Sequence, residues 1–373
     1  MKRTLLGLLC AIATLTAEER PNILLIVSED NGPELGCYGQ PYVNTPVLDE
    51  LAANGIRFNR AYVPQAGCSQ SRAALLTGLY PHQNGQIGLA TWKFRMYDEQ
   101  TPNLVRSLKD AGYRTGIIGK LHINPSTAFP FDFEAIPSSN FSRKRLSEYA
   151  VKSREFINAA DGPFFLSVNY PDAHRPFLAQ VDGMPTKLLT GDDVTPLAYF
   201  GLDSPELRQQ TADHLNCMSR LDSLVGDLLN VLDESGKRDQ TLIVYMGDHG
   251  ADMLRGKRTS YEGGLRVPLI VSYPSQIEKG QVRNELVSTL DLMPTFLELA
   301  KVEPLAGLAG HSLSPMFRKH SKQDWREYLF TEFHLHSAHN YFPQRTVCDH
   351  RYKLIWNLMP DQENPGYEFT RQK

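Results

Sequence analysis

Short, continuous apolar runs recur along this chain, and polar or charged residues follow each of them. The clearest runs are NILLIVS at 22–28, FFLSVN at 164–169 and TLIVYM at 241–246. Unbroken apolar runs of this length are typical of strands that are buried on both faces of a parallel sheet. Residues 113–119 and 267–272 also have the pattern of strands. Together, the runs predict a buried, mostly parallel β-sheet.

Helical patterns separate these strands. In the first of them, Thr45 and Pro46 stand where a cap and a first turn are expected, and Gly55 follows the end. Helices are expected at 45–54, 101–111, 143–159, 205–234 and 290–300, and another opens at residue 68. The alternation predicts an α/β fold: a doubly wound, mostly parallel sheet flanked by helices.

The alternation of strand and helix patterns ends near residue 326. Segments 327–333 and 351–356 have the pattern of strands without an intervening helix, which indicates a small antiparallel C-terminal subdomain. We therefore expect a large α/β domain at 18–320 and a subdomain at 321–373. The subdomain is expected to be incomplete, because no helical pattern follows to pack against its sheet.

The N-terminus has the layout of a secretory signal peptide. Lys2 and Arg3 precede the apolar run LLGLLCAIATL, and Ala17 provides a small residue for a cleavage site. We expect a signal peptide at 1–17 and a secreted or periplasmic protein. No later apolar run is long enough to cross a bilayer, so no membrane span is expected after cleavage.

The bulk properties exclude some classes of partner and site. A net charge of −3 and a pI near 6.4 give no global basic field for nucleic acid. Four scattered cysteines remain after signal cleavage: Cys37, Cys68, Cys217 and Cys348. Their number and spacing do not suit a disulfide framework, and without a CxxC pair a structural zinc site is not expected.

Ionisable residues follow four of the predicted strands. They are Glu29, Asp30, Lys120, His122, His174, Asp248 and His249. A single pair of this kind commonly lies in a capped or solvated turn, but the carboxyl ends of parallel strands meet at one edge of the sheet, where ligands bind. The carboxylates suit Ca²⁺ or Mg²⁺ rather than a soft metal, whereas His249 is less typical of calcium.

Cys68 lies in GCSQSRAALLTG, at the expected start of a helix. A helix N-terminus favours anions and lowers the pKa of a thiol, and Arg72 lies one helical turn further on. A buried apolar cysteine and a reactive one both remain open on this evidence. The surrounding sequence gives no signature of a cysteine protease.

The stretch CSQSRAALLTGLYPHQNG resembles the signature of the type I sulfatases, a family of the alkaline phosphatase superfamily. The resemblance extends to NILLIVSEDNGPELGCYG, GYRTGIIGKLHI, MGDHG and GKRTSYEGGLRVPLIV, and covers roughly residues 20–300. The phrases LLTGL-x-x-HQNG, GIIGK-x-H and FPFDF are most similar to the heparan N-sulfatase (sulfamidase) group. On this resemblance, 18–320 is a sulfatase catalytic domain.

The resemblance implies roles for individual residues. Cys68 is expected to be oxidised to formylglycine (3-oxoalanine), whose hydrated aldehyde attacks sulfur, and Arg72 is expected to steady it. The residues at metal-ligand positions are Glu29, Asp30, Cys68, Asp248 and His249, with Ca²⁺ expected before Mg²⁺. The residues expected to hold the sulfate or move protons are Lys120, His122, His174 and Lys257.

Three positions depart from the family pattern. Gln70 stands where the modification motif has Pro or sometimes Ala. Glu29 replaces a usual Asp, and His249 stands where the sulfamidase group has Asn, although DHG occurs in other sulfatases. A flexible calcium site tolerates the last two changes.

The resemblance implies an exported hydrolase that removes sulfate, as an ester or an N-sulfo group, during degradation of a sulfated glycan. The maturation partner would be a formylglycine-generating enzyme or its equivalent, and a homodimer is among the states allowed. One alternative is a phosphate or phosphonate ester hydrolase of the same superfamily. Another is a descendant that binds sulfated glycans without turnover.

Overall fold

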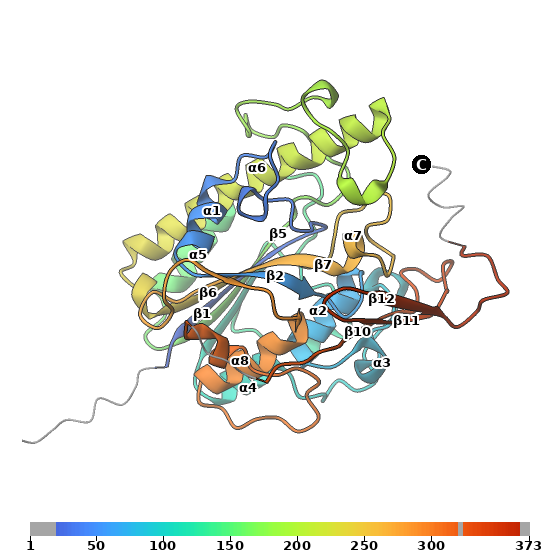
Figure 1. Ribbon diagram of the computed structural model, residues 1–373. Helices are drawn as coiled ribbons and strands as arrows, with labels where there is room; N and C mark the ends of the chain where they lie inside the picture. The colour runs from blue at the N-terminus through green and yellow to red at the C-terminus, as the bar shows by residue number, and fades with distance from the viewer. Residues whose placement is uncertain (1–19, 320–323, 366–373) are drawn as a thin grey trace, which may run out of the picture.

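A computed structural model of the protein describes residues 20–319 and 324–365 (Figure 1). The signal peptide expected at 1–17 lies outside the described residues. Within those ranges, no helix combines the length and apolar character needed to span a membrane. The structure has a large mixed sheet between two layers of helices, with a small sheet beside it.

The large sheet has nine strands among the described residues, in the order β4-β3-β5-β1-β6-β7-β2-β8, with β9 also paired to β2. They are β1 (Asn22–Ser28), β2 (Ile56–Tyr62), β3 (Arg114–Gly119), β4 (Phe133–Ala135), β5 (Phe164–Tyr170), β6 (Thr241–Gly247), β7 (Arg266–Ser272), β8 (Gln281–Arg283) and β9 (Val287–Ser288). The central strand β1 pairs in parallel with both β5 and β6. This arrangement confirms the predicted fold class.

Several strands of the large sheet differ from the sequence expectation, and the short strands β4, β8 and β9 were not predicted. β7 runs antiparallel to both of its neighbours, β6 and β2, which its apolar run could not reveal. β2 was not foreseen, because Arg57, Asn59 and Arg60 interrupt its apolar residues. These polar side chains line a cavity of about 560 Å³ beside the small sheet.

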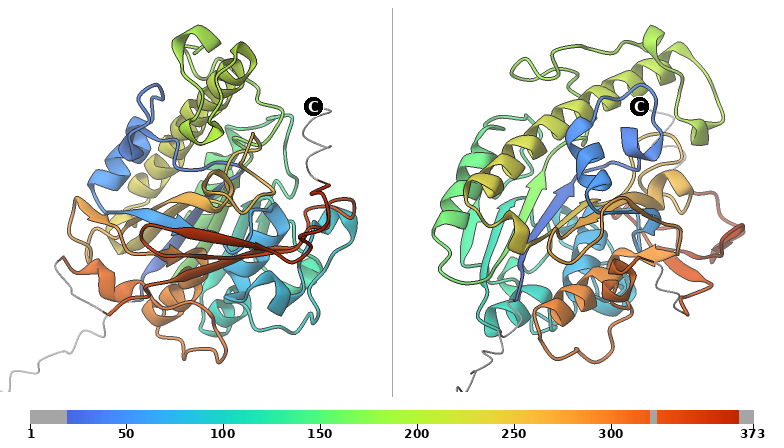
Figure 2. Two further views of the ribbon diagram at one scale, coloured as in Figure 1. Left: turned by 45° about the vertical axis from the view of Figure 1, so that its right-hand side comes forward. Right: turned by 60° about the vertical axis from the view of Figure 1, so that its left-hand side comes forward.

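Helices cover both faces of the large sheet (Figures 1 and 2). They are α1 (Pro46–Ala53), α2 (Cys68–Thr77), α3 (Pro81–Asn84), α4 (Leu104–Asp110), α5 (Glu148–Asn158), α6 (Pro205–Glu234), α7 (Glu262–Leu265) and α8 (Leu292–Leu299). Buried side chains of α1, α5 and α6 form one core cluster with the sheet, and those of α2, α4 and α8 form the other. Each layer buries a continuous apolar surface, which is the main stabilising contribution to such a fold.

Two predicted helices, α4 and α5, begin three or more residues later than expected. The cap of α4 is Asn103, whose side chain accepts a hydrogen bond from the backbone N–H of Arg106, so Thr101 stays outside the helix. The start predicted at Arg143 is also wrong, because α5 begins at Glu148. Arg143 has a φ of 50° and is fully buried in an ion pair with Asp172, which removes it from the helix.

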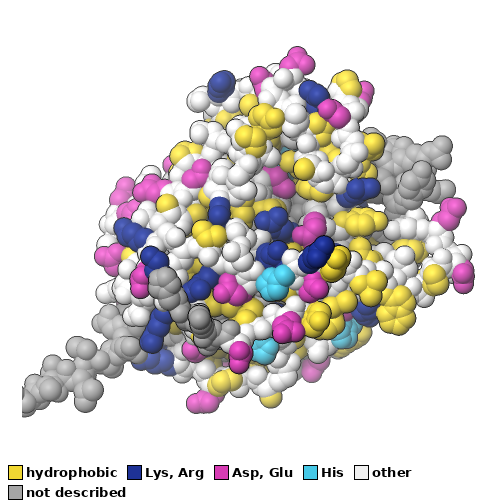
Figure 3. All heavy atoms as spheres, in the orientation of Figure 1, with side chains coloured by type: hydrophobic (Ala, Val, Ile, Leu, Met, Phe, Trp, Pro, Cys, Tyr) yellow, Lys and Arg dark blue, Asp and Glu magenta, His cyan; other side chains and the backbone are white. Residues whose placement is uncertain are grey.

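The small sheet is antiparallel, with the order β10-β11-β12. Its strands are β10 (Leu329–Phe333), β11 (Gln344–Cys348) and β12 (Lys353–Asn357), of which β11 was not foreseen. The backbone N–H of Glu332 donates to the carbonyl of Pro64, 2.8 Å away, and joins this sheet to the segment before α2. Figure 3 shows hydrophobic side chains gathered over the small sheet, where Phe330, Leu354 and Trp356 are each more than half exposed.

Candidate active site

The carboxyl ends of β1 and β6 bring three carboxylates together. The backbone N–H of Asp248 donates to the carbonyl of Ser28, and Asp248 Oδ1 accepts from the backbone N–H of Asp30; both distances are 2.9 Å. Asp30 has a φ of 53°, a left-handed conformation that is uncommon for a non-glycine residue and recurs at functional sites. The parallel register of the two strands therefore sets the relative position of these acids and of Glu29.

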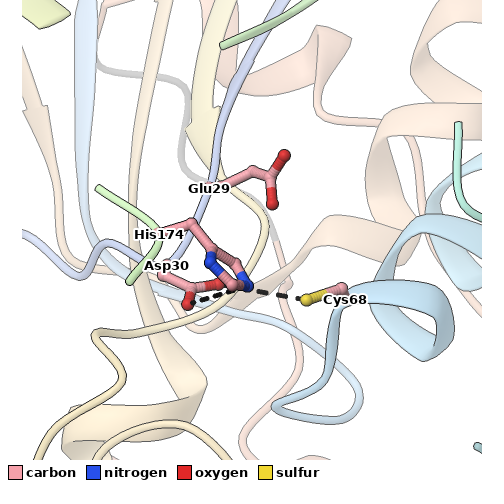
Figure 4. Close-up of side chains that lie close together, drawn as sticks. All are labelled: Glu29, Asp30, Cys68 and His174. Atoms are coloured by element: carbon pink, nitrogen blue, oxygen red, sulfur yellow. Dashed lines mark hydrogen bonds and ion pairs between the residues drawn. The ribbon is translucent and has the colours of Figure 1, made fainter. Parts of the chain in front are cut away.

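Cys68 faces this cluster from the first turn of α2. Its Sγ lies 3.3 Å from His249 Nε2 and 3.9 Å from Asp30 Oδ1, and its side chain is buried. Figure 4 shows the His174 ring pointing toward Asp30 and Cys68. Cys68 therefore lies at the same edge of the sheet as Asp30 and His249.

The surroundings of Cys68 stabilise negative charge. Burial raises the pKa of the thiol, but Lys120, Lys257 and His249 outweigh burial and hold the pKa well below its ordinary value. Lys120 and Lys257 are themselves almost fully buried. An anionic group placed beside Cys68 would meet the same cations at low local dielectric, where their attraction is strong.

Arg72, one helical turn after Cys68, forms hydrogen bonds to residues at the ends of three strands. Its Nε donates to Asp248 Oδ2 at 3.1 Å, and NH1 donates to the Lys120 carbonyl at 2.8 Å and to Asn169 Oδ1 at 2.7 Å. Arg72 therefore fixes the ends of β3, β5 and β6 relative to α2. Asn169 was not identified from the sequence, although it ends the FFLSVN run at the predicted ligand edge.

Each lysine of the site is paired with a different carboxylate. Lys120 Nζ lies 2.6 Å from Glu29 Oε2, and Lys257 Nζ lies 2.8 Å from Asp30 Oδ2. The Lys257 pair joins residues that are 227 positions apart, so only the tertiary structure could reveal it. The tertiary structure thus brings Lys257 beside the strand-end residues.

The two predicted proton-transfer histidines lie in different settings. His122 has a φ of 57°, and neither ring nitrogen has a hydrogen-bond partner among the described residues; burial lowers its pKa. Burial also lowers the pKa of His174, but Asp30 outweighs this effect, so the overall shift is upward. His174 Nε2 lies 3.8 Å from Asp30 Oδ2. The histidines are therefore biased toward opposite protonation states.

Phe141 forms a wall of the site that the sequence did not identify. Its ring stacks on His174 with centroids 3.9 Å apart, and Lys120 Nζ lies 5.1 Å from its centroid. Phe141 lies in an irregular loop ahead of α5, where no strand-end or helix pattern marks it. No signal in the sequence alone would have placed it at this site.

Asp172 supports the loop that carries His174 and was also not identified from the sequence. Its carboxylate is fully buried and accepts from Arg143 Nε at 3.0 Å, from Arg220 Nε at 2.8 Å and from Arg220 NH2 at 2.7 Å. Arg143 also donates to the carbonyl of His174. Two buried guanidinium groups around one carboxylate hold this loop against α6.

The donor set fits a hard divalent cation. The ligand-type atoms of Asp30, Cys68, Asp248 and His249 lie within 4.8 Å of one another, as do those of Glu29, Asp30, Cys68 and His174. The buried Glu29 Oε1 has no hydrogen-bond partner among the described residues. A buried carboxylate oxygen without a donor is costly, and a cation would satisfy it.

Two family models match the chain. Residues 21–302 match the model described as Sulfatase, and residues 247–368 match the model described as N-sulphoglucosamine sulphohydrolase, C-terminal. The N-sulphoglucosamine sulphohydrolase of Homo sapiens is 32% identical over 372 residues, covering 90% of this chain and 73% of that protein. The chain thus spans about three quarters of this relative.

Solved structures share the fold at lower sequence identity. The protein BT4656, in complex with its substrate D-glucosamine-2-N,6-O-disulfate, aligns with a TM-score of 0.72 at 22% identity and covers 95% of each chain. The phosphonate monoester hydrolase of Agrobacterium radiobacter aligns with a TM-score of 0.71 at 20% identity, covering 92% of this chain and 90% of that one. The length of the family match and the identity to the human relative establish that this chain belongs to the sulfatase family.

Proposed function

We propose that this protein is an exported sulfatase that hydrolyses sulfate groups of a sulfated glycan. The observation that carries the proposal is the setting of Cys68, which lies between buried carboxylates and two buried lysines at the ligand edge of the sheet. Membership of the sulfatase family supports the reaction class. The apolar, positively charged N-terminus of the sequence supports export.

We assign the cation site to the carboxylates of Glu29, Asp30 and Asp248 together with His249 and the residue derived from Cys68. Calcium fits this set better than magnesium, because calcium tolerates irregular oxygen geometry and a longer side chain such as Glu29. When bound, the cation would stabilise negative charge on the nucleophile and on the sulfate oxygens.

Oxidation of Cys68 to formylglycine by a maturation enzyme would supply a hydrated aldehyde as nucleophile. Arg72 holds the surrounding strand ends in place through Asp248 and Asn169. Lys120 and Lys257 would bind the sulfate oxygens, because both ammonium groups are buried beside position 68 and a cation bound to Glu29 and Asp30 would compete for the carboxylates that they now contact.

The histidines would divide the proton transfers. His174, with its raised pKa, is suited to donate a proton to the departing amine or hydroxyl. His122, with its lowered pKa and two unpartnered ring nitrogens, is suited to accept one. The opposite protonation biases of these two side chains support separate acid and base roles.

An N-sulfo group on a glucosamine is the favoured substrate chemistry. Two observations support it: the match of 247–368 to the N-sulphoglucosamine sulphohydrolase C-terminal model, and the identity to the human enzyme of that name. BT4656 was solved with a sugar that carries both an N- and an O-sulfate. Sulfate release from N-sulfated and O-sulfated disaccharides, measured side by side, separates these two specificities.

Peptide mass spectrometry of protein from its native host tests the mechanism. We expect formylglycine at position 68, and wholly unmodified cysteine would contradict the proposed mechanism. Glycan binding without sulfate release by that unmodified protein would support the non-catalytic alternative instead.

A phosphonate ester hydrolase is the second candidate, because the Agrobacterium enzyme shares the fold. Hydrolysis of aryl sulfates compared with aryl phosphates and phosphonates separates the two. A preference for the phosphorus esters would overturn the sulfatase assignment.

A further inference from the structure

Three side chains outside the candidate active site converge where α3 meets the small sheet. His82 belongs to α3, Glu332 belongs to β10, and His334 follows β10 directly. Their ligand-type atoms all lie within 4.8 Å of one another. His82 and Glu332 are 250 positions apart, so packing of the small sheet creates this group.

The Glu332 carboxylate presents one oxygen to each imidazole. Oε2 lies 2.5 Å from His82 Nδ1, and Oε1 lies 3.3 Å from His334 Nε2. Oε1 also accepts the backbone N–H of His82 at 2.9 Å, which fixes the carboxylate in this orientation. The Glu332 side chain is only 3% exposed, so both imidazoles face a buried anion.

His334 Nε2 is incompletely satisfied in this cluster. It is buried and lies 3.3 Å from Glu332 Oε1, but it makes no hydrogen bond to the described residues. A buried polar atom without a hydrogen bond is energetically costly. A cation between His334 and the carboxylate would satisfy both atoms, and His82, whose side chain is 47% exposed, leaves a route from solvent.

We propose that His82, Glu332 and His334 bind one divalent transition-metal ion of the Zn²⁺ type. Two imidazole nitrogens and one carboxylate form a ligand set that suits zinc, with a position left for water. Calcium prefers oxygen ligands, so a site of two imidazoles and one carboxylate differs in chemistry from the cluster around Asp30, in which carboxylates predominate. The nearby Arg345 lies 4.0 Å from Glu332 Oε2 with a side chain 38% exposed, and it can move into solvent as the metal enters.

The metal would fasten the small sheet to the segment that carries the active site. α3 begins four residues after α2 ends, and the carbonyl of Leu335, next to His334, accepts a hydrogen bond from Gln70 of α2. A metal ion bound by both His82 and His334 would therefore link β10 to the α2–α3 segment. We expect metal-bound protein to resist proteolysis within residues 334–343.

Titration of the full, tag-free, calcium-saturated protein with Co²⁺ and then Zn²⁺ tests the site. We expect one equivalent of Co²⁺ with the visible d–d absorption of nitrogen and oxygen ligands, displaced by Zn²⁺. His82→Ala and His334→Gln should each raise the dissociation constant at least about tenfold. His350→Ala, which removes an exposed imidazole from the same sheet, should leave it unchanged.

Two results of the binding measurements and one result of the absorption spectrum would overturn the proposal. One is the absence of saturable Co²⁺ or Zn²⁺ binding to the wild type, and the other is equal affinity in both variants and the wild type. A thiolate-to-cobalt charge-transfer band would show that the metal binds at Cys68 and would contradict the site at His82, Glu332 and His334. His82→Ala keeps the test valid if His334→Gln fails to fold, because the His82 side chain is half exposed.

Discussion

Gln70 in α2 donates a hydrogen bond from Nε2 to the carbonyl oxygen of Leu335, at 2.8 Å and across 265 positions of sequence. The same nitrogen lies 3.3 Å from the carbonyl of Ile87. Gln65 donates to both of these carbonyls as well, at 3.0 and 3.4 Å. The residue that departs from the family motif thus helps to attach the small sheet to the helix that carries Cys68.

Replacing Gln70 with Ala should destabilise the protein by about 1–2 kcal/mol, because the two carbonyls lose one of their two donors and keep only Gln65. Chemical denaturation measures the change in the free energy of unfolding. The matched control is Gln180→Ala, an exposed glutamine that also donates to one carbonyl, for which we expect a change within about 0.5 kcal/mol. Equal effects of the two substitutions would contradict the role of Gln70.

Replacing Gln70 with Pro should increase the fraction of chains that carry formylglycine, because it restores the family motif at this position. The helix should persist, since the backbone N–H of Ser71 is the first in α2 to donate, to the Gly67 carbonyl at 2.8 Å. Quantitative peptide mass spectrometry on both proteins from one expression host measures the modified fraction. An unchanged fraction would show that Gln70 does not limit maturation.

Replacing Asp172 with Asn should cost about 3–5 kcal/mol of stability, because two buried guanidinium groups lose their carboxylate. Sulfate release should also fall in the folded variant, since Arg143 would no longer hold the His174 loop. The control is Asp203→Asn, which breaks an exposed pair with Arg208 and should leave thermal stability and activity unchanged. Similar stability of the two variants would refute the argument.

Asp222 should make stability depend on pH. Its carboxylate accepts from the backbone N–H groups of Val47 and Leu48 at the start of α1, and burial raises its pKa from 3.8 to about 6 despite these bonds. A raised folded pKa contributes stability that is complete below pH 3.8 and is lost as the pH rises through about 6.

Asp222→Asn should remove this dependence. The stability of the wild type minus that of the variant should fall by about 2–3 kcal/mol between about pH 4 and about pH 7. Urea denaturation of both proteins across this range gives the difference directly, because contributions from other groups cancel. A difference that stays constant with pH would show that the pKa of Asp222 is not raised.

Calcium should raise the melting temperature of the wild type, and chelation with EGTA should reverse the shift, because a ligand that binds only the folded state stabilises it. Glu29→Gln should weaken the calcium response at least about tenfold in affinity, since the site loses a carboxylate charge. Glu303→Gln, which changes an exposed acid, should behave as the wild type does. The proposed ligand set would be wrong if Glu29→Gln responded to calcium as the wild type does.

The sequence by itself determined the core sheet and the edge at which its ionisable residues lie. The apolar runs that became β1, β5 and β6 are local patterns, and Glu29, Asp30 and Asp248 follow them directly. A strand that is buried on both faces must consist mainly of apolar residues, so these strands can be predicted from the sequence alone. The start of α2 at Cys68 was also predicted, from the helical pattern SRAALLTG that follows it.

Only the tertiary structure decided which of these residues meet. Hydrophobic periodicity in the sequence does not reveal the antiparallel direction of β7 or the position of Arg143 outside α5. It also does not reveal the contact of Phe141 with His174. The group at His82 and Glu332 likewise depends on how the small sheet packs against α3. Hydrophobic periodicity reports the burial of a residue within its own element, whereas partners separated by hundreds of residues are set by sheet register and by packing between elements.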